Sequence, residues 1–431
     1  MKKSPYIIIA VSFAAVILLG MLLLKLPFSV QEGQSLAWVD SLFISTSAIC
    51  VTGLSPIMDV GATLSIFGKF VLALLIQIGG LGFVTIAVYI MVLLGVKIGI
   101  EERQIVKEAL NQNTLKGLMR LVKQIVFTTI IVELSGFVMY MFVFTQDYDF
   151  WTSIGFSAFH AISAFNNCGF DLLGAESFMM YKDNILLNIN VMMLIMLGGL
   201  GFIVISDVFA KKFNFKKFNL HTRTVLIMST ALWVGGMCLL KITEGGNITW
   251  LQALFQSVGA RTAGFATMDM SQISNGGALV MIVLMIIGAA PCSTGGGIKI
   301  TSAYAIIKSI IGHARGKRPM ISGRAISEKS IYRAYILLVM SILAITMSTF
   351  LMSIVEKDAT LVSLIFESAS AFGTVGFSMG LTPSLHTLSK LVLVPLMYMG
   401  RLGPLTLMAL LAKRYDMSGK VGYIEEPLII G

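Results

Sequence analysis

The stretch Gly373-Thr374-Val375-Gly376-Phe377-Ser378 decides the fold, because three related stretches precede it at regular spacing. They read Cys50-Val51-Thr52-Gly53-Leu54-Ser55, Asn166-Asn167-Cys168-Gly169-Phe170-Asp171 and Arg261-Thr262-Ala263-Gly264-Phe265-Ala266. The shared glycines, Gly53, Gly169, Gly264 and Gly376, are separated by about a quarter of the chain. The sequence therefore predicts four copies of one structural unit in a single polypeptide.

The composition predicts a membrane protein. Of the 431 residues, 56% are hydrophobic and only 13% are charged. A soluble core cannot bury that much apolar surface, so lipid must solvate much of it. Tyr6–Leu24 and Phe67–Val96 are long enough to span a bilayer as helices. The first of these runs lacks a convincing small-residue cleavage site, and we therefore expect it to be retained as a span.

A short amphipathic stretch precedes each glycine signature, and apolar spans flank each pair. The short stretches are Ala37–Ile49, Phe150–Phe165, Trp250–Gly259 and Leu361–Phe372. They are too short to cross a bilayer, which is typical of re-entrant pore helices. We predict an all-α integral membrane fold in which eight transmembrane helices and four half-helices surround a pseudo-fourfold pore. The expected repeats are residues 1–100, 101–215, 216–315 and 316–415, followed by a cytoplasmic tail, 416–431.

The charges predict the orientation of the chain. Most of the 32 Lys and Arg residues lie at the termini and between the repeats, whereas the segments with glycine signatures are rich in acids. Basic loops stay on the inside of a membrane, so both termini should be cytoplasmic and all four signatures should face outward. The net charge of +10 is then a topology signal rather than a sign of nucleic-acid binding. Asp171, directly after a signature, is the one acid that we expect to attract cations.

The last signature, Thr374-Val375-Gly376-Phe377, resembles the Thr-Val-Gly-Tyr core of potassium-channel filters, whose backbone carbonyls replace the water shell of the ion. Glycine allows the backbone angles that this requires, and the negative C-terminal ends of the half-helices should help. The predicted K⁺ ligands are the carbonyls of Val51, Thr52, Gly53 and Leu54, of Asn167, Cys168, Gly169 and Phe170, of Thr262, Ala263, Gly264 and Phe265, and of Thr374, Val375, Gly376 and Phe377. Only the last copy is complete, so we expect weaker K⁺ discrimination than in a tetrameric channel.

The four signatures and their arrangement resemble, over nearly the whole chain, the Trk/Ktr/HKT superfamily of potassium transporters, and within it the membrane subunits of bacterial Ktr systems. The resemblance implies potassium uptake across the bacterial cell membrane, with sodium as a possible activator. It also implies a homodimer with one pore in each protomer and a cytosolic ring of KtrA-type RCK subunits that bind nucleotide. The docking loops would be Lys97–Lys123, Lys211–Arg223 and His313–Arg333. The chain itself carries no nucleotide-binding motif, organic-cofactor site or catalytic constellation.

A second set of glycines lies 24 to 31 residues after the signatures, in the second span of each repeat. Gln77–Gly82 and Leu197–Gly201 are explained by close helix packing. In the third repeat, Pro291 and three consecutive glycines cannot belong to an unbroken helix. We predict a loop, residues 289–299, at membrane depth, which resembles the gating loop of the superfamily. Its predicted gate residues are Ala290, Pro291, Cys292, Ser293, Thr294, Gly295, Gly296, Gly297 and Lys299.

Buried charges complete the predicted site. Arg401 should face the interior, as a barrier to cations or bound to carbonyls of the third-repeat loop; the alternative is that it reaches the cytoplasmic surface. Arg261 should brace its strand against a carboxylate, with Glu367 as a candidate. Glu133 and Asp207 should make interhelical bonds. The apolar end of the tail, Tyr423–Gly431, is predicted to dock at the dimer or regulator interface.

Other functions are less well supported by the sequence. A secondary transporter for another solute would also use broken helices, but inverted repeats would alternate in orientation. A relative selective for Na⁺ or NH₄⁺ would share the scaffold; in this superfamily serine in place of the first filter glycine shifts preference toward sodium, and this chain has Gly53. The spacing of Cys50, Cys168, Cys238 and Cys292 fits neither a disulfide framework nor a metal site.

Overall fold

The computed structural model describes residues 5–96, 98–110, 115, 117–174, 176–321 and 324–404. The fold within these ranges is helical, apart from a short antiparallel pair, β1 (Met320–Ile321) and β2 (Arg324–Ala325). The tail, residues 416–431, and with it the predicted docking segment 423–431, lies outside the described residues.

Four helices are long and apolar enough to cross a membrane. They are α1 (Pro5–Lys25), α7 (Leu118–Phe144), α11 (Leu220–Glu244) and α15 (Glu328–Val355). α1 covers the span predicted at Tyr6–Leu24; a proline in its first turn and a lysine in its last turn suit the two ends of a helix. α15 exposes large apolar side chains such as Ile342 and Phe350, as a lipid-facing helix does.

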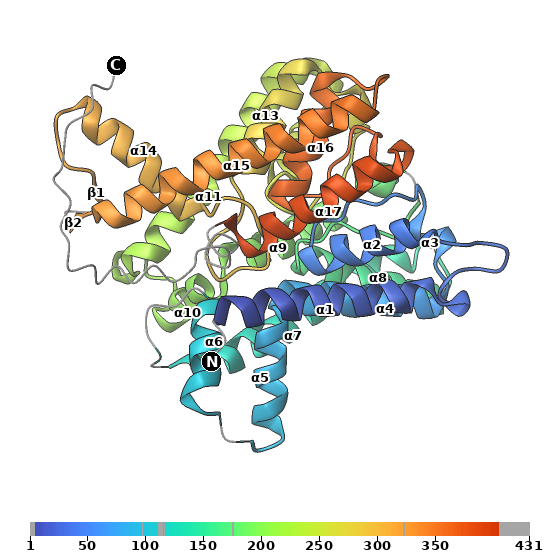
Figure 1. Cartoon of the computed structure of the whole chain (residues 1–431), viewed down its shortest axis with the longest axis horizontal. Coiled ribbons are helices and arrows are strands. Elements are labelled where there is room, and N and C mark those ends of the chain that lie inside the picture. The colour runs from blue at the N-terminus through green and yellow to red at the C-terminus, as the bar shows by residue number, and fades with distance from the viewer. Residues whose placement is uncertain are drawn as a thin grey trace.

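A short helix packs against each long helix (Figure 1). These are α2 (Trp38–Cys50), α8 (Phe150–Phe165), α12 (Trp250–Gly259) and α16 (Leu361–Gly373). Their bounds lie within one residue of the predicted ones. Polar side chains fix three of their starts: Asp149 and Thr360 accept from backbone N–H groups, and Thr249 forms a capping box with Gln252.

The second helices of the first two repeats are bent, which contradicts the continuous span predicted over Phe67–Val96. α4 (Ile66–Leu81) meets α5 (Phe83–Leu93) at 93°, and α9 (Ile185–Leu200) meets α10 (Phe202–Ala210) at 96°. The turning residues, Gly82 and Gly201, have φ of 82° and 87°, which side-chain-bearing residues rarely adopt. If each bent pair counts as one span, up to six helical segments of the described residues are long and apolar enough to cross a membrane.

The other two repeats also have interrupted second helices. In the third, α13 (Asn275–Ile286) stops and α14 (Ile300–Ala314) starts 14 residues later in the numbering. In the fourth, α17 (Thr387–Leu402) ends at Gly403, whose φ is 86°. The interruption predicted for the third repeat alone is therefore also present in the first two, and α17 of the fourth ends at a glycine with positive φ.

Glycines three residues before these turns serve close packing. A Cβ added to Gly79, Gly198 or Gly400 would overlap a backbone oxygen at the end of a short helix, that of Ile49, Phe165 or Phe372 respectively. The packing interpretation of these motifs is correct for these glycines. It is incomplete because Gly82 and Gly201, in the same motifs, turn the chain.

The remaining helical elements are short or lie at the periphery. They are α3 (Val60–Thr63) and α6 (Ile100–Ala109), with 3₁₀ turns at Pro27–Ser29, Ser177–Tyr181, Phe215–Lys217, Gly245–Asn247, Met270–Gln272 and Thr382–Ser384. Figure 1 shows α5 and α6 below α1; α6 packs against α1, and its Val106 is buried.

The last repeat closes on the first. α17 packs against α2, and two polar contacts reinforce the junction. The Tyr398 hydroxyl donates to the Ala10 carbonyl oxygen at 2.6 Å, and Lys390 Nζ lies 2.8 Å from Asp40 Oδ1. The four repeats are therefore arranged around a common centre and not in a linear row.

Candidate functional site

The four glycine signatures meet in a closed ring, here called the glycine ring: residues 51–54, 167–170, 262–265 and 374–377. A Cβ built on any of its central glycines would overlap a carbonyl oxygen of the next strand. The pairs are Gly53 with Cys168, Gly169 with Ala263, Gly264 with Val375, and Gly376 with Thr52. One backbone oxygen from each strand therefore lies in the ring, and the four strands follow one another around it in chain order.

The backbone of the ring is unusual in the same way in every copy. The central glycines have φ between 60° and 102°. The first residues of the strands, Val51, Asn167, Thr262 and Thr374, also have positive φ, between 52° and 80°. Such a conformation costs a non-glycine residue about 1–3 kcal/mol and is characteristic of functional sites. The surrounding structure must therefore hold these strands in place.

The short helices run directly into the strands. In the first, second and fourth copies the helix ends in the same pair of hydrogen bonds; in the first, Val51 N–H donates to Ala48 O at 3.1 Å and Thr52 N–H to Ser47 O at 2.7 Å. The third copy differs, because Ala263 and Gly264 both donate to Gly259 O. The negative ends of the helix dipoles thus lie beside the ring, where a cation would be stabilised.

Polar side chains from the short helices hold the strands from behind. Ser163 Oγ donates to Phe170 O at 2.6 Å, and His160 Nε2 accepts from Leu172 N at 3.2 Å. In the fourth copy Ser370 Oγ accepts from Gly376 N at 3.1 Å. These residues are not among those predicted from the sequence, although polar side chains on otherwise apolar short helices are a visible signal.

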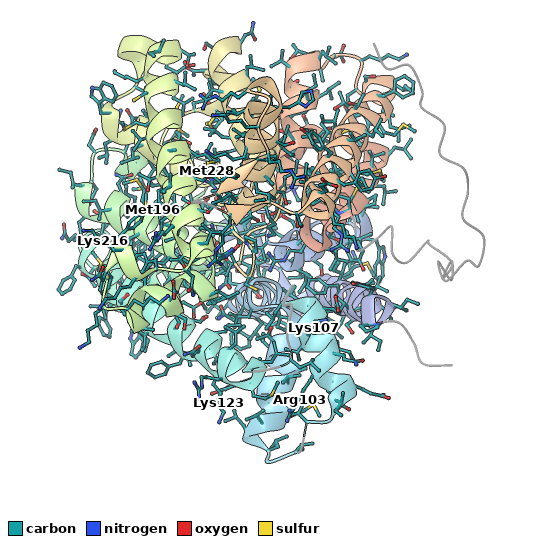
Figure 2. The ribbon with its side chains drawn as sticks, turned by 90° about the vertical axis from the view of Figure 1, so that its left-hand side faces the viewer. Arg103, Lys107, Lys123, Met196, Lys216 and Met228 are labelled. Carbon is teal, nitrogen blue, oxygen red and sulfur yellow. The ribbon has the colours of Figure 1, made fainter. Side chains whose placement is uncertain are left out.

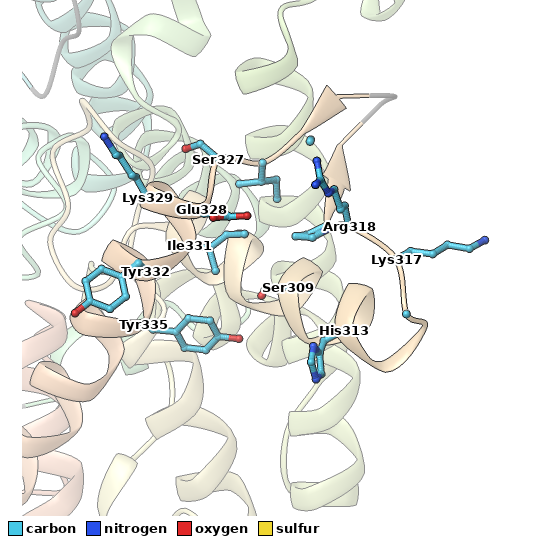
Figure 3. A pocket seen from close by; sticks show the side chains of 14 residues that line it. Ser309, His313, Lys317, Arg318, Ser327, Glu328, Lys329, Ile331, Tyr332 and Tyr335 are labelled. Atoms are coloured by element: carbon cyan, nitrogen blue, oxygen red, sulfur yellow. The ribbon is translucent and has the colours of Figure 1, made fainter. Parts of the chain in front are cut away.

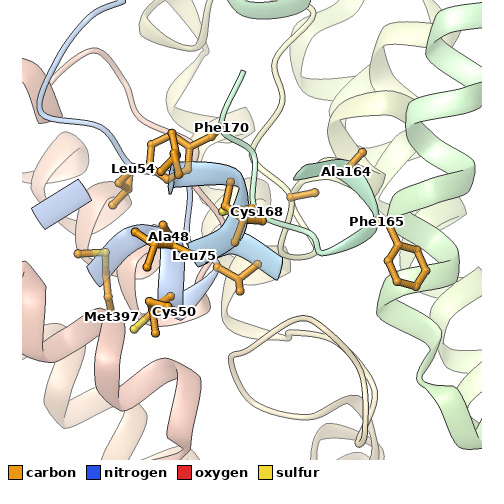
Figure 4. Packing of buried hydrophobic residues seen from close by; sticks show 14 of the residues in the cluster. Ala48, Cys50, Leu54, Leu75, Ala164, Phe165, Cys168, Phe170 and Met397 are labelled. Carbon is orange, nitrogen blue, oxygen red and sulfur yellow. The ribbon is translucent and has the colours of Figure 1, made fainter. Parts of the chain in front are cut away.

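Apolar packing completes the support. Figure 4 shows Leu54, Cys168 and Phe170 among the side chains packed around the first two strands. Cys50 and Cys168 are free, buried thiols within this packing. Among the described residues, no group of three or more His, Cys, Asp or Glu side chains is placed to hold a metal ion. The ring itself offers backbone carbonyls and the side-chain oxygens of Thr52, Asn167, Thr262 and Thr374.

The predicted pair of Arg261 and Glu367 is wrong. Arg261 Nη2 instead donates to the carbonyl oxygen of Gly288, at 2.7 Å. The buried Glu367 carboxylate accepts from the hydroxyls of Ser378 and Thr382, the latter at 2.7 Å. Arg261 therefore links the third strand to Gly288, two residues after the end of α13, while Glu367 fixes the segment that follows the fourth strand.

The predicted loop of the third repeat is present and runs from residue 287 to residue 299. Its two ends pair with each other, since Gly288 N donates to Ile298 O at 2.9 Å. Its middle bonds to the other second helices: Ala290 N donates to Gly199 O at 3.0 Å, and Gly297 N donates to Gly400 O at 3.2 Å. The loop is thus fastened to the interrupted ends of α9 and α17.

Part of the loop lies against the glycine ring. Thr294 Oγ1 donates to Asn167 Oδ1 at 2.9 Å, and Gly296 N donates to Thr374 Oγ1 at 3.0 Å. A Cβ on Gly295 would overlap the Thr262 hydroxyl. Three of the predicted gate residues, Thr294, Gly295 and Gly296, therefore contact the first residues of three strands.

Other predicted gate residues face away from the ring. Cys292 O accepts from Phe202 N at 2.9 Å, at the start of α10, and its thiol contacts the Leu110 carbonyl oxygen. Ser293 Oγ donates to Ala290 O at 2.6 Å, within the loop. The Pro291 carbonyl oxygen lies against Gly201, at the bend between α9 and α10.

Arg401 holds the loop from the fourth repeat. Its guanidinium donates to the Thr294 carbonyl oxygen and to those of Gly79 and Gly80, the last at 3.0 Å. The predicted contact with carbonyls of the loop is confirmed, and the alternative, a side chain reaching the cytoplasmic surface, is wrong. Lys299 Nζ donates to Gly295 O at 2.6 Å, so a second cationic group lies at the loop.

The two acids predicted to bond between helices do so. Glu133 on α7 accepts from Asn166 Nδ2 at 3.1 Å and from Gln77 Nε2 of α4 at 3.4 Å. Asp207 on α10 accepts from the backbone N–H and the side chain of Asn219, both at 2.9 Å, just before α11.

Asp171 lies in the segment after the second strand, where it accepts from Leu173 N at 3.1 Å. Burial raises the pKa of this carboxyl to about 6, and the neighbouring Asp59 carboxylate acts in the same direction. Its charge therefore changes near neutral pH.

Comparisons with known proteins agree on one family. Residues 2–420 match the family model described as TrkH, a cation transport protein. The chain is 38% identical to the Ktr system potassium uptake protein B of Bacillus subtilis, over 96% of this chain and 94% of that protein. It is 36% identical to the potassium/sodium uptake protein NtpJ of Enterococcus hirae, over 100% of this chain and 98% of that protein.

The fold matches a solved structure of the same kind. The crystal structure of the potassium transporter TrkH from Vibrio parahaemolyticus superimposes with a TM-score of 0.72, covering 95% of this chain and 85% of the other at 20% identity. The match at this identity concerns the fold, whereas the family-model match covers nearly the whole sequence. The chain therefore belongs to the TrkH family of cation transport proteins.

Proposed function

We propose that this protein takes up potassium across the bacterial cell membrane through a pore whose selectivity filter is the glycine ring. The observation that carries the proposal is the closure of the ring, with one backbone oxygen from each strand against the next glycine. Backbone carbonyls in such an arrangement replace the hydration shell of a cation. The names of the relatives as potassium uptake proteins support K⁺ as the transported ion.

The loop 287–299 is the gate in this proposal. It lies against Asn167 and Thr374, at the ends of the strands that join the short helices. Arg401 and Lys299 place positive charge at the loop, which opposes passage of a cation. Opening requires the loop to leave the ring.

The proposed orientation has both termini in the cytoplasm and the ring opening outward. Figure 2 shows Arg103 and Lys107 on α6 and Lys123 near the start of α7, the end of this long helix that precedes its apolar part. Basic residues remain on the cytoplasmic side of membranes.

A homodimer and a cytosolic nucleotide-binding ring of the KtrA type are the proposed partners. The relatives named as parts of a Ktr system support a multi-subunit assembly. A pocket of about 890 Å³ lies in the predicted docking segment His313–Arg333, between α14 and the start of α15 (Figure 3). Arg318, Glu328 and Tyr335 line this pocket, so it offers both charge signs and aromatic surface to a protein partner.

Growth of a potassium-uptake-deficient bacterium at submillimolar potassium tests the proposal. The wild-type chain should rescue growth, and Gly376→Ser should not, with equal membrane expression of both. Co-expressing or omitting the regulatory subunit shows whether the pore works alone. Failure of the wild type to rescue growth with the regulator present would contradict potassium uptake.

A second candidate is uptake of another monovalent cation, because one relative is named a potassium/sodium uptake protein. Three of the four strands lack the complete channel-like string, which favours reduced discrimination. Competition of Na⁺ and NH₄⁺ with ⁸⁶Rb⁺ uptake distinguishes the two candidates. The same assay with and without Na⁺ tests sodium activation. Alternating access by a secondary transporter would appear as strict coupling of uptake to a second ion.

A further inference from the structure

The first residues of the four strands share a positive φ but differ in the polarity of their side chains. Asn167, Thr262 and Thr374 have polar side chains, whereas the side chain of Val51 is apolar. All four are completely buried. The three polar side chains contact one another or the loop: Asn167 Nδ2 donates to Thr262 Oγ1 at 3.2 Å, and Thr374 Oγ1 accepts from the loop.

The loop uses the oxygens of these side chains. Thr294 Oγ1 donates to Asn167 Oδ1 at 2.9 Å, and Gly296 N donates to Thr374 Oγ1 at 3.0 Å. The backbone of Gly295 and Gly296 lies so close to Thr262 and Thr374 that a Cβ on either glycine would overlap a threonine hydroxyl. The loop therefore fills the space beside these oxygens as well as bonding to them.

Side-chain oxygens at this position are also suitable ligands for a cation. Hydroxyl and amide oxygens bear lone pairs that bind either a donor hydrogen or a cation. An N–H or O–H group aimed at such an oxygen presents positive charge, so it repels a cation at the same place. The loop backbone also excludes a cation sterically from the side that it covers.

We propose that the closed loop and a monovalent cation at the inner end of the glycine ring compete for the side-chain oxygens of Asn167, Thr262 and Thr374. The closed loop then blocks the path sterically and also occupies the oxygens that would bind the cation. By linkage, a cation that binds there weakens closure to the same extent that closure weakens its binding. This inference rests on the proposed potassium uptake and adds a control of the gate by the transported ion itself.

Accessibility of the loop to a thiol reagent tests the competition. The probe is Ser293→Cys, in a chain where Cys238 and Cys292 are replaced by serine and the buried Cys50 and Cys168 remain. The rate of modification by a methanethiosulfonate reagent is measured on the purified protein in K⁺ and in N-methylglucamine at equal ionic strength. Ser330→Cys, exposed in the first turn of α15, is the matched control.

We expect Ser293→Cys to be modified roughly fivefold faster in K⁺, the factor that one typical buried hydrogen bond represents. The control should be unaffected by K⁺. Adding Thr294→Val removes a bond of the closed loop but keeps the ligands, so modification without K⁺ should become faster. Adding Thr374→Val removes a ligand together with the acceptor of Gly296 N, so modification without K⁺ should become faster and the effect of K⁺ should shrink.

Equal modification rates in K⁺ and N-methylglucamine, in a probe variant that still takes up ⁸⁶Rb⁺ in proteoliposomes, would overturn the competition and leave the proposed function intact. If the wild-type chain with its regulator takes up no cation, the proposed function itself fails. An undiminished K⁺ effect in the Thr374→Val variant would also overturn the assignment of these side chains.

Discussion

Gly376 lies so close to the carbonyl oxygen of Thr52 that no side chain fits between the fourth strand and the first. The two residues are 324 positions apart, and their contact closes the ring. The φ of Gly376, 102°, is also unfavourable for any other residue. Space and backbone conformation therefore both require glycine here.

Gly376→Ala should abolish ⁸⁶Rb⁺ uptake into proteoliposomes. The new Cβ pushes the fourth strand away from Thr52 and adds about 1–3 kcal/mol of backbone strain. Gly235→Ala is the control, because nothing lies near that position in α11 and alanine favours a helix by up to about 1 kcal/mol. Normal uptake by the Gly376 variant would show that the ring is not the ion path.

Arg401→Gln should raise uptake measured without the regulatory subunit. The substitution removes donors to Thr294, Gly79 and Gly80, so the loop loses its link through Arg401 to the first repeat. Each buried carbonyl left unpaired costs about 1–3 kcal/mol, so the melting temperature should fall as well.

Lys390→Gln is the control for Arg401, since it removes a cation from the same helix but breaks only the pair with Asp40. It should lower stability slightly and leave uptake unchanged. Reduced uptake by a well-folded Arg401→Gln protein would contradict the role of Arg401 as a restraint on the loop.

Gly201→Ala should destabilise the protein more than Gly82→Ala. Both glycines turn a helix with positive φ, so either substitution costs about 1–3 kcal/mol of strain. A Cβ on Gly201 would also lie 2.6 Å from the Pro291 carbonyl oxygen, whereas one on Gly82 meets only Thr85 Oγ1 at 3.8 Å. Thermal unfolding in detergent measures the difference, with Gly155→Ala in α8 as the control. Equal losses would mean that the loop is not packed against this bend.

Uptake at low potassium should fall as the external pH drops from 7.5 to 5. Burial raises the pKa of Asp171 to about 6, so this carboxylate is charged at pH 7.5 and neutral at pH 5. A negative charge at the mouth raises the local cation concentration, and its loss lowers the rate by up to about tenfold.

The Asp171→Asn variant should take up cations more slowly than the wild type at pH 7.5, and its uptake rate should change little with pH. Because the pKa is raised from 3.8 to about 6 in the folded protein, stability falls as the pH rises between these values, and the full loss is present above about pH 6. The Asn variant should therefore melt higher than the wild type at pH 7.5 and equally at pH 4. An unchanged pH profile of uptake in the Asn variant would remove Asp171 from the ion path.

The sequence predicts those parts of the fold that are determined by residues adjacent in the chain. The bounds of the four short helices are predicted within one residue because each helix ends at a glycine signature. The loop of the third repeat was predicted because Pro291 and consecutive glycines exclude a helix whatever their surroundings.

The incorrect predictions concern features that depend on contacts with residues distant in the sequence. A single glycine costs a helix only about 1 kcal/mol, so Gly201 did not reveal a bend. The bend is fixed by the third-repeat loop, since Phe202 N donates to Cys292 O at 2.9 Å. Arg261 and Glu367 are plausible partners by charge, but hydroxyls of Ser378 and Thr382 already satisfy the Glu367 carboxylate.

The contact of the fourth strand with the first has a consequence for biosynthesis. A ribosome must add Gly376 before Thr52 can acquire its neighbour, so nascent chains with one, two or three repeats in the membrane have an unclosed centre. The ion pair between Asp40 and Lys390 also forms only after the last quarter of the chain has been synthesised. An unfinished or prematurely terminated chain therefore cannot close the glycine ring, which forms only when synthesis is nearly complete.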